Sequence, residues 1–410
     1  MSVLLPLILL SSLIPGIATF FVPEERARLR NTLNLGAALV KTSLVVALLV
    51  GVSQGELYEV RVALLPGVEF LLHADAWSLM FISLSSLLWL VTTLYAIGYL
   101  AHSRQRSRFF GFFSLCVFST AGIALSGNLI TFLIFYELLT LATYPLVVHK
   151  GTPESISAGR KYLAYTLFGG TLFLAGVVWL TAVAGPIEFS ATGVLAGRSD
   201  LSPTLLQGIF LLLIAGLGVK AALVPLHSWL PASMVAPAPV SALLHAVAVV
   251  KAGAFGISRV VYDVYGVEFS AALGVTTPLA IAAAITILYG STMALFQDGL
   301  KRRLAYSTVS QVSYIALGTA IAGPIATIGG IVHLVHQGLM KITLFFCAGN
   351  LDETLGITKV SQMNGVGRRM PWTMAAFTIA ALGMIGVPPW RDSCRNGTSA
   401  TAPWKAVPTG

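Results

Sequence analysis

Apolar runs of membrane-spanning length recur along the whole chain, separated by short polar segments. A helix needs about 20 mostly apolar residues to cross the hydrocarbon core of a bilayer. The predicted membrane helices lie near 3–22, 33–53, 76–98, 109–127, 128–148, 162–185, 205–225, 238–260, 271–296, 304–322, 326–349 and 372–389. The first run has no basic residue before it and no clear small-residue cleavage site, so we interpret it as a membrane helix and not as a signal peptide.

The composition agrees with this pattern. Of the 410 residues, 56% are hydrophobic and only 10% are charged, whereas a soluble domain carries roughly a quarter charged residues. So few charges cannot cover a water-facing surface, and the predicted fold class is an all-α polytopic membrane protein of about twelve spans. The three cysteines form no C-x-x-C pair, which argues against zinc, iron–sulfur and disulfide frameworks.

The basic residues predict the orientation. Segments after odd-numbered helices carry Arg26, Arg28, Arg30, Arg104, Arg106, Arg108, Lys150, Arg160, Lys161, Lys301, Arg302, Arg303, Lys359, Arg368 and Arg369. Segments after even-numbered helices carry only Arg61, Arg198 and, at a helix end, Arg259. Basic segments stay cytoplasmic, so we expect a multi-pass protein of the plasma (inner) membrane with its N-terminus outside. The net charge of +9 therefore does not indicate nucleic-acid binding.

The outward segments are correspondingly acidic. They carry Glu56, Glu59, Glu69, Glu188, Asp200, Asp263 and Glu268.

Two proline-containing stretches interrupt the helical pattern at membrane depth. The first contains Pro225, His227 and Pro231, and the second contains Pro388 and Pro389. Proline disrupts a helix, and the freed backbone groups need protein or water partners inside a membrane. Interruptions at corresponding positions of two halves indicate a transport site between repeats. The two breaks lie five helices apart, so the predicted repeat is inverted.

The positions of the two breaks divide the chain into four predicted segments. Residues 1–108 form N-terminal membrane helices, 109–265 the first inverted-repeat unit and 266–389 a second, incomplete unit. Residues 390–410 are a polar tail without periodicity, which we expect to be disordered because it cannot bury enough apolar surface to offset its ordering entropy.

Ionisable side chains inside the predicted helices are few. A charge in the hydrocarbon core costs several kcal/mol, so such residues are functional candidates. The candidates for proton translocation are Glu137, Lys220, His245, Lys251, His333, His336 and Lys341. We predict that they form a lateral polar line near the middle of the membrane. Lys41 is close enough to a cytoplasmic segment for its side chain to snorkel to the interface.

The residue types suggest how such a line would work. A buried lysine whose carboxylate partner moves can load and release a proton, so we expect Glu137 and Lys220 to approach each other. The alternative is a structural ion pair. His333 and His336 share a helix face and fit either a relay or hydrogen-bonded core histidines. His227 fits a relay and a helix-end hydrogen bond equally well.

No motif for redox, nucleotide or metal chemistry is present in the sequence. It contains no Gly-rich dinucleotide fingerprint, no P-loop and no metal-ligand cluster. We therefore expect no cofactor and no metal site in this chain. It would be classed as an enzyme only through membership of a larger redox complex.

Several motifs resemble one protein family. Residues 218–232 (GVKAALVPLHSWLPA) are similar to a signature of the antiporter-like subunits of respiratory complex I, Mrp-type sodium/proton antiporters and membrane-bound hydrogenases. The segments 135–137, 241–259 and 336–349 resemble further elements of this family, and the resemblance covers about residues 70–389. It implies fourteen helices with two inverted five-helix units. By position, Glu137 matches the family's tuning glutamate, Lys220 its central lysine and Lys251 its connecting lysine.

Within the family, the region before the core and residues 73–78 (HADAWS) resemble the D-type subunit of the Mrp-type antiporters. This implies a subunit that moves protons or cations, with sodium as a further candidate, in a lipid bilayer and beside other membrane subunits. The alternatives are a proton-pumping subunit of NADH-quinone oxidoreductase or of a membrane-bound hydrogenase, and a structural subunit without transport.

The chain departs from the family after Pro389. The family continues helix twelve with a lysine or glutamate and adds two helices, whereas residues 390–410 are polar. This abrupt change indicates a truncated or frame-shifted end, with a naturally shortened paralogue as the alternative. On the first interpretation we expect this product to be inactive in ion translocation.

Overall fold

A computed structural model describes residues 3–198 and 200–387, and each of the twelve predicted membrane segments contains a helix within these residues. The first half contains α1 (Leu4–Phe20), α2 (Ala27–Ser53), β1 (Glu59–Leu65), β2 (Val68–His73), α3 (Ala76–Tyr99), α4 (Arg106–Leu125), α5 (Leu129–Val147), α6 (Pro153–Ala184) and α7 (Pro203–Lys220). The second half contains α8 (Trp229–Ala232), η1 (Ser233–Val235), α9 (Ala238–Ala246), α10 (Val249–Arg259), η2 (Val260–Tyr265), α11 (Val267–Ala272), α12 (Thr276–Leu295), α13 (Leu300–Ile321), α14 (Pro324–Leu355), η3 (Val360–Gln362), α15 (Val366–Arg369) and α16 (Pro371–Ile385).

Nine of the described helical segments are long and apolar enough to cross a membrane, with α9, α10 and η2 counted together as one. The apolar helices α1 and α16 are shorter, with 17 and 15 residues, and α13 carries three basic residues in its first turn. The predicted all-α, polytopic membrane fold is therefore confirmed.

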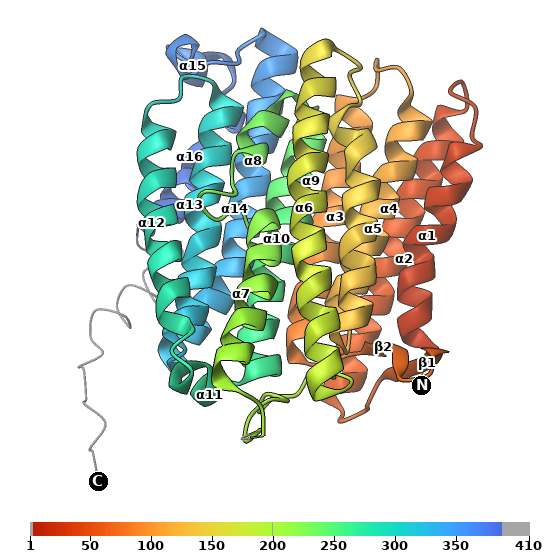
Figure 1. Cartoon of the computed structure of the whole chain (residues 1–410). Helices are drawn as coiled ribbons and strands as arrows, with labels where there is room; N and C mark the ends of the chain where they lie inside the picture. Colours follow the sequence, from red (N-terminus) through yellow and green to blue (C-terminus); the bar gives the residue numbers. More distant parts are fainter. Residues whose placement is uncertain (1–2, 199, 388–410) are drawn as a thin grey trace.

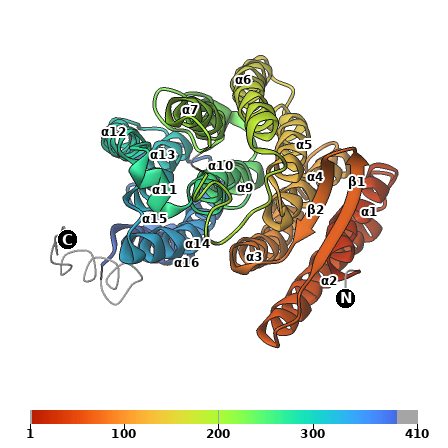
Figure 2. The ribbon, with the colours of Figure 1, turned by 60° about the horizontal axis from the view of Figure 1, so that its bottom comes forward.

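The helices stand side by side in one bundle (Figure 1). The N-terminus and the β1–β2 hairpin lie at one end, and α15 lies at the other. The view in Figure 2 places α9 and α10 between the α3–α6 group and the α12–α14 group. Within Ala238–Tyr265, the apolar stretch that is long enough to cross a membrane is entirely buried. This segment therefore forms the centre of the bundle.

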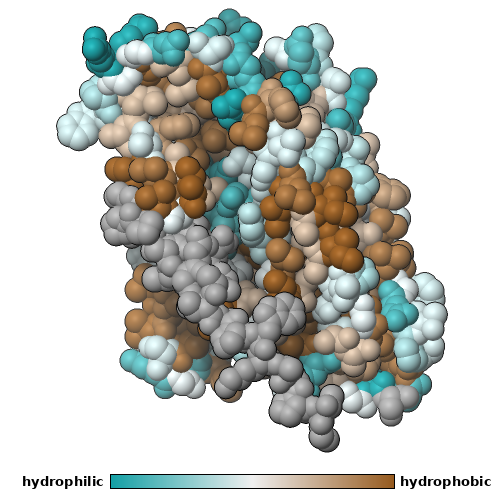
Figure 3. Space-filling view, turned by 90° about the vertical axis from the view of Figure 1, so that its left-hand side faces the viewer, coloured by the Kyte–Doolittle hydropathy of each residue, from teal (hydrophilic) through white to brown (hydrophobic). Residues whose placement is uncertain are grey.

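Apolar side chains cover the outside of the bundle at mid-height. Ile281, Ile285 and Leu288 of α12 and Phe168 and Val178 of α6 are all more than half exposed. Figure 3 shows one side of the molecule, with a hydrophobic band between more hydrophilic ends. Such a band is expected where lipid tails contact the protein.

The β1–β2 hairpin lies in a segment that was predicted only as an acidic connection. Its strands pair antiparallel around a turn at Pro66 and Gly67. Arg61 forms ion pairs with Glu59 at 2.6 Å, Glu69 at 3.0 Å and Glu188 at 2.5 Å. Because these side chains are more than a third exposed, each pair adds little stability.

The first predicted helix break falls where the structure interrupts the helix, although Pro231 lies inside the four-residue helix α8. α7 ends at Lys220 and α8 begins only at Trp229. The indole Nε1 of Trp229 donates to the Val219 carbonyl at 2.7 Å, and the Val224 amide donates to Thr286 Oγ1 at 3.0 Å. Side chains thus satisfy backbone groups that the break releases. The second predicted break, at Pro388 and Pro389, lies outside the described residues.

The eighth predicted helix is interrupted as well, and this was not predicted. α9 ends at Ala246, α10 begins at Val249, and the π-helical turn η2 follows α10. No proline or glycine marks residues 247 and 248. The interruption places His245 in the last turn of one helix and Lys251 in the first turn of the next.

Two predictions from the sequence are wrong. Lys41 does not snorkel: it is fully buried, and its Nζ donates to Ser12 Oγ at 3.2 Å and to the Val117 carbonyl at 3.4 Å. Asp263 is not in an outer connection: it lies in η2, with its side chain 6% exposed and paired with Arg259. The partners of Lys41 come from packing against α1 and α4, which a local hydropathy pattern does not show, whereas Arg259 lies four residues before Asp263 in the same helical segment.

Candidate functional site

The broken end of α7 brings Lys220 against α5. Lys220 is fully buried, and its Nζ donates to the backbone carbonyl of Tyr136 and lies 3.3 Å from the centre of the Tyr136 ring. Tyr136 directly precedes Glu137, so the lysine and the carboxylate act on each other electrostatically. Glu137 Oε1 is buried and has no hydrogen-bond partner among the described residues. The structure thus places a buried cation and an unsatisfied carboxylate oxygen in one region.

Two glycines permit this packing. A Cβ added at Gly170 of α6 would overlap Glu137 Oε1. A Cβ added at Gly253 of α10 would overlap the Ala221 amide nitrogen, just after Lys220. Only glycine therefore lets α6 and α10 approach the Glu137–Lys220 region this closely.

Lys251 connects α10 to α14. It is fully buried, and its Nζ donates to the Leu334 carbonyl at 2.7 Å. His333, adjacent to Leu334, contacts the Gln311 carbonyl of α13 through Nε2 at 2.9 Å. Lys251 of α10 therefore contacts the residue of α14 that follows His333.

Lys341 lies about two turns further along α14. It is also fully buried, and its Nζ donates to Ser307 Oγ at 2.7 Å and to the Leu304 carbonyl at 3.2 Å. His336 is half-buried on the same helix. Thus α14 carries three of the seven predicted proton-translocation residues along one stretch.

His245 packs against α14 without forming a polar contact. Its ring centre lies 4.6 Å from that of Phe345. Both ring nitrogens are buried and have no hydrogen-bond partner within the described part of the chain. Such a group needs water or a rearrangement to be satisfied.

His227 lies in the α7 break and is 7% exposed. Its ring is 4.8 Å from the Tyr289 ring and 6.3 Å from the Tyr306 ring. The choice between relay and helix-end hydrogen bond stays open for this residue.

One polar residue inside this region was not predicted from the sequence. Gln337 of α14 is fully buried, and neither its amide nitrogen nor its amide oxygen has a partner among residues 3–198 and 200–387. Its amide carries no charge, so a search of the sequence for ionisable residues in apolar runs does not find it. Within the same residues, no group of three or more histidines, cysteines or carboxylates could hold a metal ion.

Comparison with known proteins places these residues in a family. The profile described as "NADH:quinone oxidoreductase/Mrp antiporter, TM" matches residues 126–395. NADH-quinone oxidoreductase subunit N of Desulforudis audaxviator is 37% identical over 366 residues, which are 87% of this chain and 71% of that protein. The D-type subunit of the Na(+)/H(+) antiporter of Alkalihalophilus pseudofirmus is 29% identical over 321 residues, which are 78% of this chain and 64% of that protein.

The chain spans 50% of the length of a further relative, subunit L of Mycobacterium tuberculosis NADH-quinone oxidoreductase. The identities to the first two relatives do not single out the D-type antiporter subunit, which residues 73–78 resemble.

Solved structures agree on the fold. A chain of an archaeal membrane-bound sulfane sulfur reductase matches with a TM-score of 0.84 and 26% identity, covering 94% of this chain and 78% of that chain. A chain of the Mrp complex from Dietzia matches with a TM-score of 0.85 and 24% identity, covering 97% of this chain and 74% of that chain. The second match concerns the fold alone. The profile match extends over more than half of the chain and includes all seven proton-translocation candidates, so this protein belongs to the NADH:quinone oxidoreductase/Mrp antiporter transmembrane family.

Proposed function

We propose that this chain is a proton- or cation-translocating membrane subunit of a multisubunit assembly. The observation that carries the proposal is the buried Lys220 at the α7 break, held beside the residue that precedes Glu137. A buried lysine near a carboxylate exchanges its proton when the distance to that carboxylate changes. About 100 mV of membrane potential supplies roughly 2.3 kcal/mol per charge, enough to shift such an equilibrium more than tenfold.

The proposed route runs from Glu137 and Lys220 to Lys251 and then along α14. Contacts between neighbouring elements support each step: Gly253 packs on the α7 break, and Lys251 reaches the Leu334 carbonyl. Gly338 of α14 closely approaches the Ala246 carbonyl of α9, next to His245. Gaps between the polar groups would be bridged by water.

We further propose that residues 109–265 and 266–389 act as two inverted units, with other membrane subunits as partners. The chain would lie in the plasma (inner) membrane with its N-terminus outside. The basic residues after odd-numbered helices support this orientation.

A second candidate function is a proton-pumping subunit of a redox complex. The 37% identity to a protein named NADH-quinone oxidoreductase subunit N supports it. In that case the same buried residues would move protons, and redox centres in partner subunits would supply the driving force.

Proton flux in inverted membrane vesicles tests both candidates, with the chain coexpressed with the membrane subunits encoded beside it. For the antiporter, adding sodium or potassium ions should dissipate a preformed pH gradient, and Lys220→Met should abolish this response. For the redox pump, NADH should drive acidification that depends on Lys220. Flux that is unchanged in Lys220→Met under both conditions would leave a structural role for this chain.

A further inference from the structure

A cavity of about 650 Å³ lies at the hairpin end of the molecule, outside the Glu137–Lys220 region. Its wall includes His73 and Asp75 before α3, Asp263 of η2 and Thr327 and Ile331 of α14. It therefore lies between the start of α3 on one side and η2, which follows α10, and α14 on the other.

A buried charge cluster stands at this wall. Arg259 is 2% exposed and pairs with the lining residues Asp75 and Asp263 at 2.5 Å each. It also donates to Ser78 Oγ at 3.1 Å. Two carboxylates and one guanidinium leave a net charge of about −1 when all three are ionised. Asp75 is 28% exposed and Asp263 only 6%, so Asp75 is the water-accessible member.

The remaining groups around the cavity do not cancel this charge. His73 contributes an imidazole ring to the wall, and the Tyr262 hydroxyl contacts Thr327 Oγ1 at 3.0 Å. The other lining residues from α3, from the 189–191 segment and from α14 are apolar or uncharged. No lysine or arginine is among the lining residues that the structure describes.

The cavity lies near the buried polar route. Lys251 and Arg259 are eight residues apart on α10, which corresponds to about 12 Å along the helix axis. Thr327 and His333 are six residues apart on α14, or about 9 Å. Asp263 lies in the π-helical turn η2, and such turns occur frequently at functional sites.

We propose that this cavity is a water-filled, cation-attracting vestibule through which protons or monovalent cations pass between the hairpin side of the membrane and the buried Lys251–His333 region. Walls of low dielectric focus the field of Asp75 and Asp263 and raise the local concentration of cations. Arg259 neutralises part of that field and separates the vestibule from the interior. The inference deepens the proposed function and rests on it for the identity of the ion.

Thiol labelling tests the vestibule without any transport assay. Ile331→Cys is made in the full chain after Cys116, Cys347 and Cys394 are replaced, and membranes are exposed to two impermeant methanethiosulfonates, one trimethylammonium and one sulfonate. Ile331 lies seven residues after the start of α14, about 10 Å into the helix. Its neighbour Val332 is 38% exposed outside the lining set, so Val332→Cys is the control at equal depth.

We expect Ile331→Cys to react from the hairpin side and Val332→Cys to remain unreactive in lipid. After normalisation to reaction with free mercaptoethanol, the cationic reagent should react at least fivefold faster than the anionic one. Asp75→Asn or Asp263→Asn should each reduce this preference to less than twofold, whereas Glu268→Gln, an exposed acid on the same side, should leave it unchanged. Asp75→Asn and Asp263→Asn test the effect of the carboxylates independently of each other. The thermal stability of each variant is compared with that of the parent protein that carries Ile331→Cys alone.

An unreactive Ile331→Cys would show that the cavity is not water-filled and would overturn the proposal. So would equal rates for the two reagents, because the carboxylates would then not set the field. Labelling does not depend on turnover. A chain that labels as expected but carries no flux would therefore refute the proposed function and leave the vestibule intact.

Discussion

At the scale of single residues, the buried polar groups differ in how completely they are satisfied. The Lys341 ammonium group has two polar partners, Ser307 Oγ and the Leu304 carbonyl. Glu137 Oε1 and both ring nitrogens of His245 have none among the described residues. An unsatisfied buried group costs about 1–3 kcal/mol. Groups that carry this cost are better candidates for proton exchange than groups held in complete networks.

Glu137→Gln should reduce proton flux at least tenfold without lowering the amount of protein in the membrane. The amide keeps the shape of the side chain but removes the charge that acts on Lys220. Flux in vesicles and protein abundance by immunoblot measure the two effects. Glu154→Gln, an exposed acid in the first turn of α6, is the control. Full flux in Glu137→Gln would leave this carboxylate only a structural role.

Lys41 offers a test of stability. Its ammonium group is fully buried, with Ser12 Oγ, the Val117 carbonyl and the Trp89 ring as its partners and no ion pair among the described contacts. Lys41→Met should preserve the thermal midpoint or raise it, because an apolar chain of similar volume avoids the burial of a charge. Lys41→Ala should cost roughly 2–4 kcal/mol through the cavity that it leaves. Unfolding in detergent, followed by intrinsic fluorescence, compares the two. If both variants were equally destabilised, the charge itself would be needed for stability.

The sequence shows which charged residues lie inside apolar runs but not which groups contact them. Charges inside apolar runs are visible directly, so Glu137, Lys220 and Lys251 could be selected. Lys41 was misinterpreted because its distance along the chain from a basic segment suggested an interfacial side chain, whereas residues of α1, α3 and α4 enclose it. Gln337 carries no charge and gave no signal, although its burial makes it equally unusual.

At the scale of helices and strands, hydropathy predicted each of the nine described helical segments that are long and apolar enough to cross a membrane, and proline predicted the α7 break. The interruption at residues 247 and 248 had no local signal, because alanine and valine occur in any helix. On the two sides of this interruption, α9 packs against α14 and α10 packs against α7. The β1–β2 hairpin did have a signal, the Pro66–Gly67 turn between apolar residues, which was overlooked.

Gly253→Ala should destabilise the protein by about 1–3 kcal/mol, because the added methyl group meets the backbone of the α7 break. Gly208→Ala in α7 has no atom within 4 Å of the added group, so it should be neutral or slightly stabilising. Thermal unfolding of the two purified variants gives the comparison. Equal midpoints would mean that α10 can move away from Lys220 at little cost.

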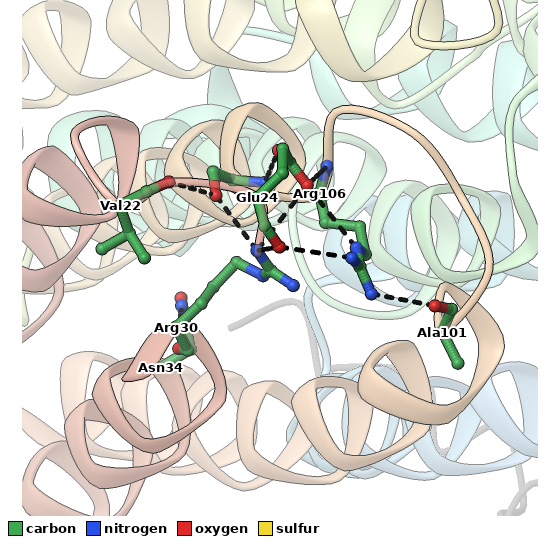
Figure 4. A network of polar contacts seen from close by, with 7 residues as sticks. Val22, Glu24, Arg30, Asn34, Ala101 and Arg106 are labelled. Atoms are coloured by element: carbon green, nitrogen blue, oxygen red, sulfur yellow. Dashed lines mark hydrogen bonds and ion pairs between the residues drawn. The ribbon is translucent and has the colours of Figure 1, made fainter. Parts of the chain in front are cut away.

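Glu24 connects the α1–α2 turn to the start of α4 (Figure 4). Its carboxylate accepts hydrogen bonds from the Arg106 amide at 3.1 Å and the Ser107 amide at 2.9 Å. Partial burial opposes the charged form, but these two amides, together with Arg30, hold the pKa of Glu24 below its usual value of 4.5. A carboxyl with a lowered pKa stabilises the folded state above its unfolded pKa and loses this effect as the pH falls through the folded value.

Hydrogen exchange should therefore show that the Arg106 and Ser107 amides lose protection as the pH falls through the folded pKa of Glu24, which lies below 4.5. Glu24→Gln should show low protection at every pH, compared with the parent under identical conditions. Glu25→Gln, at an exposed neighbouring position, should behave like the parent. Protection that is independent of pH in the parent would mean that water or backbone groups replace the carboxylate.

At the scale of the whole molecule, the order of helices in the bundle could not be predicted from hydropathy, because every membrane helix presents a similar apolar surface. The structure places α9 and α10 at the centre, where α3, α7, α13 and α14 surround them. This arrangement brings α10, from residues 109–265, against α14, from residues 266–389, at Lys251 and Leu334. The proposed pairing of two inverted units stays a prediction.

The charges at the two ends of the molecule predict the orientation of the bundle in the membrane. The end with α15 carries Arg368 and Arg369, while the opposite end carries the hairpin acids Glu59 and Glu69. Since basic segments stay in the cytoplasm, the hairpin should face outward. A cysteine at Gly67 in the hairpin turn, in the cysteine-free chain, should react with an impermeant maleimide in intact cells, whereas one at Gly367 should react only after permeabilisation. The opposite labelling pattern would invert the topology, and the vestibule beside Asp75 would then open toward the cytoplasm.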